Sequence, residues 1–99
     1  MTMDGTYSIS VKTPMGNQEG SLIFKSEGSV LTGSSIAGEN TSEIQEGTID
    51  GSNFFFIVYM KTPLGKMKAK VNGSVDGNLI TGTMKVPIGT MTFDGTKID

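Results

Sequence analysis

The sequence predicts an all-β protein, an eight-stranded antiparallel up-and-down β-barrel, on the strength of three observations. Apolar and polar residues alternate with a period of two, as in strands with one buried and one solvated face. Gly or Pro interrupts nearly every window long enough for a helix. Tight-turn sequences recur at even spacing between the alternating segments. We expect the 99 residues to form one domain, 1–99.

The first four strands are expected at 5–13, 18–26, 30–36 and 41–48. In 5–13, Tyr7, Ile9 and Val11 alternate with Ser8, Ser10 and Lys12. Pro14-Met15-Gly16 ends this strand, because Pro presets φ for the first corner of a tight turn and Gly takes the position with positive φ. The polar segments 27–29 and 37–40 separate the later strands of this half.

The remaining strands are expected at 53–62, 66–75, 79–86 and 90–97. Segment 53–62 contains the longest apolar run, 54–60, and in 66–75 three lysines alternate with Met67, Ala69 and Val71. Pro63-Leu64-Gly65 and Pro87-Ile88-Gly89 repeat the turn chemistry of the first hairpin. Polar turns at 50–53 and 76–78 complete the even spacing. Closure into a barrel would remove the two exposed edges of an open sheet.

The second half of the chain repeats the first, with repeats at 1–49 and 50–99. After a shift of 49 residues, 12–16 falls on 61–65 and 31–33 falls on 80–82. In this alignment, apolar residues of the first half also fall on apolar residues of the second half, so the same face of each strand is apolar in both halves. The last strand pair needs a one-residue gap, placed so that 46–48 matches 94–96. The alternative is that the similarity reflects only the Gly and Thr that all β-hairpins share.

The turn-and-strand segments 27–33 and 76–82 resemble the repeats of calycin-type barrels such as avidins and lipocalins. The whole chain also resembles small bacterial barrel proteins of unassigned function that carry the same Thr-Pro-x-Gly hairpins. The resemblance implies a barrel fold and the habit of binding ligands inside it. Avidins and lipocalins are usually longer and carry signature Trp residues, which this chain lacks, so no site residue is carried over.

The repeat predicts an interior with two unlike walls. The apolar wall consists of Phe56, Met67, Met84, Met91 and Phe93, and the polar wall consists of Tyr7, Gln18, Ser35, Glu43 and Gln45. An unpaired polar group inside a protein costs roughly 1–3 kcal/mol, so such a cluster indicates a ligand-binding pocket. Alternatively, the alternation in 41–48 is shifted, Ile44 points inward, and Glu43 and Gln45 reach solvent. Gln18 and Ser35 could likewise lie half solvated in the barrel mouth.

The interior of an eight-stranded barrel is wide enough either for packed side chains or for one small ligand. Small residues at 20, 33, 69 and 82 favour internal space, and the methionines favour an adaptable lining. A fully packed core is the alternative. Four apolar turn tips at one end are predicted to frame a portal, to pack onto a partner chain, or to fold in as a plug. These tips are Met15, Ala37, Leu64 and Ile88.

The outer face carries two further features. If Phe54 and Phe56 point inward, then Phe55, Ile57 and Tyr59 form an outward apolar row, which predicts a homo-oligomer that buries this row. Beside it, the lysines at 66, 68 and 70 form a basic stripe. The second half has net charge +2 and the first half −4, which could orient two chains, although the lysine stripe is better explained as an ordinary solvated face with edge protection.

Composition excludes several classes of function. Without Cys or His the chain has no disulfide, no zinc–thiolate site and no Ser–His triad. A net charge of −2 without Arg argues against a nucleic-acid partner. No run is long enough to cross a membrane, and the N-terminus has no leader pattern, so we expect a cytoplasmic protein. Neither a phosphate-binding loop nor metal-ligand spacing is found, and we expect no metal and no cofactor.

Three functions are therefore carried forward. The first is a barrel that binds an apolar small molecule with one polar group in its interior. The second is an isomerase or cyclase that uses the same cavity, with catalytic candidates Glu43 and Tyr7, since a carboxyl group in an apolar barrel has a raised pKa suited to proton transfer. The third is a non-catalytic oligomerisation or interaction module with a packed core. Whether the chain is an enzyme is left open.

Overall fold

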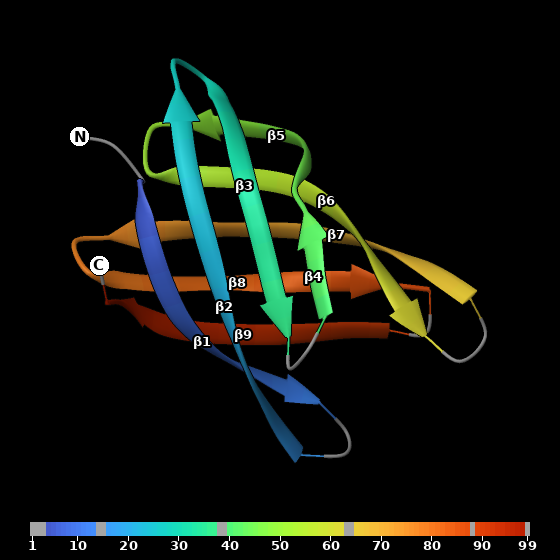
Figure 1. Ribbon diagram of the computed structural model, residues 1–99. Helices are drawn as coiled ribbons and strands as arrows, with labels where there is room; N and C mark the ends of the chain where they lie inside the picture. Colours follow the sequence, from blue (N-terminus) through green and yellow to red (C-terminus); the bar gives the residue numbers. More distant parts are fainter. Residues whose placement is uncertain (1–3, 14–15, 38–39, 63–64, 88, 99) are drawn as a thin grey trace.

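The computed structural model describes residues 4–13, 16–37, 40–62, 65–87 and 89–98, and these form a closed antiparallel β-barrel without helix (Figure 1). The fold class predicted from the sequence is confirmed. The strand segments among the described residues are β1 (Gly5–Thr13), β2 (Gly16–Glu27), β3 (Val30–Ala37), β4 (Asn40–Glu43), β5 (Gln45–Asp50), β6 (Asn53–Thr62), β7 (Gly65–Asp76), β8 (Leu79–Val86) and β9 (Gly89–Lys97).

The barrel closes by pairing its first and last strands. Each strand pairs antiparallel with its neighbour in the order β2-β1-β9-β8-β7-β6-β5-β3, and the β2–β3 pairing completes the ring. Along the closing seam, Tyr7 is opposite Lys97 and Lys12 is opposite Thr92. Figure 1 shows the blue first strand beside the red last strand. The duplication of four strands is consistent with this ring, but it stays a prediction.

β4 and β5 are the two halves of the strand expected at 41–48, and a β-bulge lies in β5, between Gln45 and Thr48. On β6, Phe55 and Ile57 are two residues apart, but their partners Thr48 and Gln45 are three apart. Glu46 adopts a φ of 50°, and the Ile44 amide donates to the Gly33 carbonyl at 3.0 Å. An extra residue resets the alternation of side chains. Consequently Ile44 faces the interior before the bulge, and Gly47 faces it afterwards.

The interior is packed at the end that carries the turns after β2, β5 and β7. We call its centre the aromatic cluster: Tyr7, Phe24, Phe54 and Phe56. The Phe24 ring lies 5.3 Å from that of Tyr7, 5.1 Å from that of Phe54 and 5.8 Å from that of Phe56, between ring centroids. Phe54 and Phe56 stack at 5.9 Å. Leu31, Val75 and Ile80 are buried in the same core, so the described side chains fill this half of the barrel.

The outward apolar row expected on β6 is less exposed than the sequence indicated. Tyr59 is 44% exposed, but Phe55 is half-buried and Ile57 is only 5% exposed. Ile57 lies between Gln45 and Lys70 on the neighbouring strands, and we attribute its burial to their long side chains. The premise of three exposed apolar groups is therefore wrong. Self-association through this row stays a prediction.

Among the described residues, no helix is long and apolar enough to span a membrane.

Candidate binding site at the barrel mouth

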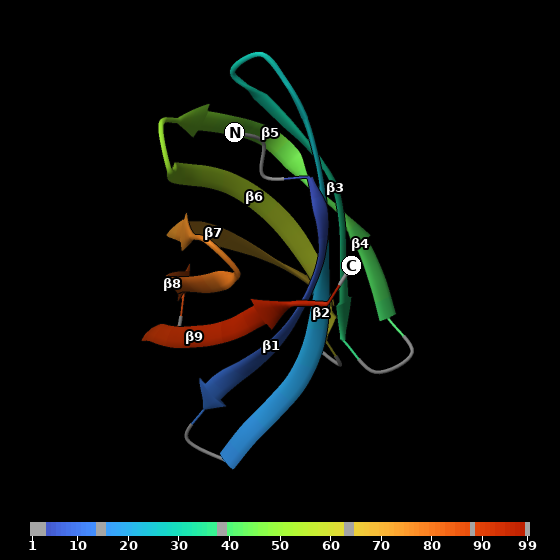
Figure 2. The same cartoon turned by 90° about the vertical axis from the view of Figure 1, so that its left-hand side faces the viewer.

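A cavity of about 380 Å³ opens at the end opposite the aromatic cluster, where β1 ends at Thr13 and β2 begins at Gly16. We call it the mouth cavity. Its walls come from two groups of strands that are far apart in the sequence, β1 to β3 and β8 to β9, which the closed ring brings together (Figure 2). The described residues that line it are Ile9, Val11, Thr13, Gln18, Glu19, Gly20, Ser35, Ile36, Ala37, Met84 and Met91.

Apolar side chains line the inner part of the mouth cavity, and polar side chains line its rim. Ile9, 6% exposed, forms the floor, and the half-buried Val11, Met84 and Met91 form the walls. Cross-strand register explains this grouping, because Val11 is opposite Phe93 and Met84 is opposite Met91, so all four side chains share the inner face. A small volume with apolar walls and a few polar groups is typical of small-molecule sites.

Polar groups stand on the β2 and β3 side of the cavity. Gln18 and Glu19 are exposed at the rim, and Ser35 is half-buried beside them. Gly20 lies close to the backbone of β3, since a Cβ there would be 2.8 Å from the Ile36 carbonyl oxygen, so this part of the lining carries no side chain. A ligand with an apolar body and one polar group matches this division of the lining.

The structure brings together four of the ten residues expected to line the interior: Gln18, Ser35, Met84 and Met91. Tyr7, Phe56 and Phe93 belong to the packed core instead, and Met67 is half-buried on β7 without lining the cavity. Of the expected portal residues, Ala37 lies at the exposed rim, whereas Met15, Leu64 and Ile88 lie outside the described residues. The sequence did not single out Thr13, Glu19 and Ile36 as lining residues.

The expected inward placement of Glu43 and Gln45 is wrong. Both side chains are exposed, and Ile44, 8% exposed, occupies the interior position between them. The bulge between Gln45 and Thr48 is the physical reason. The repeat alignment is anchored on 46–48, and carrying its register back across the extra residue assigns the opposite face to 43–45. Glu43 therefore lacks the apolar surroundings on which the isomerase hypothesis depended. Tyr7, its expected catalytic partner, is buried in the aromatic cluster.

Tyr7 is 1% exposed, and its surroundings disfavour ionisation. Burial raises the pKa of the Tyr7 phenol, and the negative charge of Asp4 raises it further. Asp4 is held nearby because its carboxylate accepts hydrogen bonds from the Ser26 amide at 2.6 Å and the Ser26 hydroxyl at 2.5 Å. These Ser26 contacts lower the pKa of Asp4. Tyr7 is thus a neutral core residue.

We expect the free energy of unfolding to fall as the pH rises above about 10. Because the folded pKa of Tyr7 is raised, its stabilising contribution is complete below the pKa of an unfolded tyrosine and is lost as the pH rises through the folded value. Urea unfolding across this alkaline range measures the slope. Tyr7→Phe should flatten it, whereas Tyr59→Phe, at an exposed position, should not. Equal slopes in the wild type and Tyr7→Phe would contradict this assignment.

The described residues contain no group of three acidic, Cys or His side chains placed to hold a metal ion.

No protein-family model matches the chain, and no curated protein matches it either. Solved structures do match. The redesigned β-barrel b11L5F_LGL superposes with a TM-score of 0.71 at 13% identity, over 98% of this chain and 92% of that chain. The redesigned β-barrel mFAP1, solved bound to DFHBI, superposes with a TM-score of 0.69 at 13% identity, over 96% of this chain and 94% of that chain.

The chain shares the fold of redesigned β-barrels. At a sequence identity of 13%, these superpositions show that the fold is shared and nothing about function. The calycin resemblance is thus confirmed only at the level of an eight-stranded antiparallel barrel, and no calycin membership follows.

Proposed function

We propose that this barrel binds a small, largely apolar molecule with one polar group in the mouth cavity. The observation that carries the proposal is a cavity of about 380 Å³ with Ile9 as its floor, methionine walls, and Gln18 and Ser35 on one side. Burial of the apolar body would contribute about 25 cal/mol per Å² removed from water. Gln18 offers amide donors and an acceptor, and Ser35 offers a hydroxyl, to the polar group.

Two further observations support ligand binding at this end. The aromatic cluster makes the opposite half of the barrel a rigid packed base, so that the mouth is built on a stable scaffold. In addition, mFAP1, a barrel of the same fold, was solved bound to DFHBI. The isomerase alternative is not retained, since Glu43 and Tyr7 lie apart. A purely packed interaction module is disfavoured by the open mouth.

Binding can be tested with DFHBI and a panel of phenol, benzyl alcohol, benzamide and toluene, followed by NMR titration of the protein. We expect amides of Val11, Ser35 and Met84 to shift. Ser35→Phe fills the cavity and should weaken binding at least about tenfold, or roughly 1.4 kcal/mol. Val30→Phe adds the same ring to the same strand at an exposed outer position and should leave binding unchanged. Equal affinity of the wild type and Ser35→Phe for the bound probe, or no binding of any probe, would overturn the proposal.

The polar side of the cavity has its own test. We expect the wild type to prefer benzamide over toluene, and Gln18→Met to lose most of that preference while retaining affinity for toluene. Because Gln18 is exposed, this substitution should change the free energy of unfolding by less than about 0.5 kcal/mol. If both Gln18→Met and Ser35→Ala still prefer benzamide over toluene, neither side chain binds the polar group of the ligand.

A further inference from the structure

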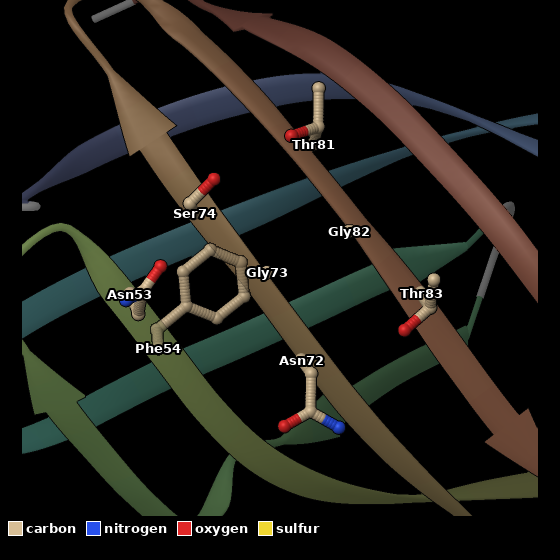
Figure 3. Close-up of a pocket in the computed structure, with 8 residues that line it drawn as sticks. All are labelled: Asn53, Phe54, Asn72, Gly73, Ser74, Thr81, Gly82 and Thr83. Carbon is tan, nitrogen blue, oxygen red and sulfur yellow. The ribbon is translucent and has the colours of Figure 1, made fainter.

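A second, polar depression lies on the outer face of the barrel, over β6, β7 and β8 (Figure 3). We call it the outer groove. It has a volume of about 420 Å³ and shares no lining residue with the mouth cavity. Its polar side chains are Asn53, Asn72, Ser74, Thr81 and Thr83. A smaller depression of about 170 Å³ adjoins it and shares Asn53, Phe54 and Asn72.

Two adjacent glycines form the middle of the groove. Gly73 and Gly82 are opposite each other on β7 and β8, and their inner sides are occupied by aromatic rings. A Cβ at Gly73 would lie 2.6 Å from Phe54 Cζ, and one at Gly82 would lie 2.6 Å from Phe93 Cζ. The core rings thus pack directly against the backbone here, so these positions must remain glycine.

The register arranges the polar side chains in two rows around this glycine pair. Asn72 is opposite Thr83 on one side of it, and Ser74 is opposite Thr81 on the other. Figure 3 shows these four side chains placed around Gly73 and Gly82. Among the described residues, none of the four side chains forms a hydrogen bond within the protein. Their donors and acceptors are therefore available to a ligand.

The chemistry of the groove specifies the ligand. No lining residue of the groove is charged, which disfavours a phosphate or a carboxylate. Each amide offers two donors and an acceptor, and each hydroxyl offers one donor and accepts as well, which matches vicinal hydroxyl groups. The adjoining depression adds Phe55, half-buried between Thr48 and Asn72, as an apolar surface for the C–H groups of a sugar ring. It also adds Asp50, whose carboxylate accepts hydrogen bonds from hydroxyl groups and repels an anion.

We propose that the outer groove binds a neutral, hydroxyl-rich ligand, namely a short neutral oligosaccharide. The site lies on the outer side of the barrel wall and does not depend on the function proposed for the mouth cavity. Because the groove is open to solvent, we expect weak binding, with Kd values in the millimolar range, as is usual when little of the ligand surface is buried.

Xylotriose, maltotriose, cellotriose and chitotriose serve as probes in NMR titrations of the whole chain. We expect at least one of them to shift the amides of Asn72, Thr81 and Thr83, and the double variant Asn72→Ala/Thr83→Val to weaken that binding at least about fivefold. Thr90→Val, a matched change at an exposed outer position on β9, should leave the affinity unchanged. Asn72 and Thr83 are themselves surface positions, and the spectrum of the double variant reports directly whether it folds.

Two results would overturn this proposal: no shift in the groove with any of the four trisaccharides, or unchanged affinity in the double variant. Ser35→Phe separates the two sites, because it should abolish binding of the aromatic probes and leave trisaccharide binding intact. Loss of trisaccharide binding in Ser35→Phe, with the groove variant unaffected, would place the sugar in the mouth cavity and also contradict the proposal.

Discussion

Replacement of Phe24 with alanine is expected to lower the free energy of unfolding by about 3–5 kcal/mol. Phe24 is 2% exposed and its ring contacts those of Tyr7, Phe54 and Phe56 within 5.8 Å, so its removal leaves a cavity that three fixed rings cannot fill. A domain of this size has a total stability of about 5–15 kcal/mol, and the loss is therefore a large part of it.

Urea unfolding monitored by circular dichroism measures this loss. The matched control is Ile23→Ala on the same strand, where the side chain is 40% exposed on the outer face and a loss below about 1 kcal/mol is expected. If Phe24→Ala does not fold, Phe24→Leu should still fold with a loss of about 1–2 kcal/mol. Similar losses in Phe24→Ala and Ile23→Ala would show that the aromatic cluster is not the centre of the core.

The second large effect is expected at Gly33, where alanine should cost at least about 3 kcal/mol. Gly33 adopts a φ of 141°, which an L-residue rarely accepts, and its Cβ would collide with the Ile23 carbonyl and lie 3.3 Å from the Phe24 Cα. Both obstacles belong to the backbone of β2, opposite Gly33, so relief requires the two strands to separate next to Phe24.

Gly89→Ala is the control that separates these two causes. Gly89 has a similar φ of 150° with nothing within 4 Å of an added Cβ, so only the conformational strain of about 1–3 kcal/mol applies there. Thermal and urea unfolding of both variants should show the larger loss for Gly33→Ala. Equal losses would mean that the β2–β3 contact adjusts without cost.

Much of the architecture follows from local sequence patterns. Alternation of apolar and polar residues with a period of two, and turns with Gly at positive φ, place the hairpins correctly, and the expected strand 53–62 coincides with β6. The inward positions of Gln18, Ser35, Met84 and Met91 in the mouth cavity also follow from alternation, because each of their strands is regular at that point. Where two strands pair without a bulge, the alternation within each strand is enough to predict which side chains face the interior.

Alternation along 41–48, by contrast, did not show where the extra residue lies. The bulge between Gln45 and Thr48 is set by the pairing of one strand with two others, β3 and β6, and its place decides that Glu43 and Gln45 face solvent. Likewise, we attribute the burial of Ile57 to its cross-strand partners Gln45 and Lys70, which come from neighbouring strands. Such features depend on contacts between distant segments, which periodicity within one strand does not encode.

The sequence by itself determined the all-β class, the hairpin order and the strands whose inner residues line the interior, because tight turns and alternation are local properties of the backbone. Only the tertiary structure decided how the interior is divided. Tyr7, Phe24, Phe54 and Phe56 meet at one end because closure brings β1, β2 and β6 around the same axis, and their rings fill that half. At the other end the lining includes the small side chains of Val11 and Ser35 and the bare backbone of Gly20, and the mouth cavity stays open. Volume is shared between side chains from many strands, so whether a barrel is packed or hollow is settled only once all of its strands are in place.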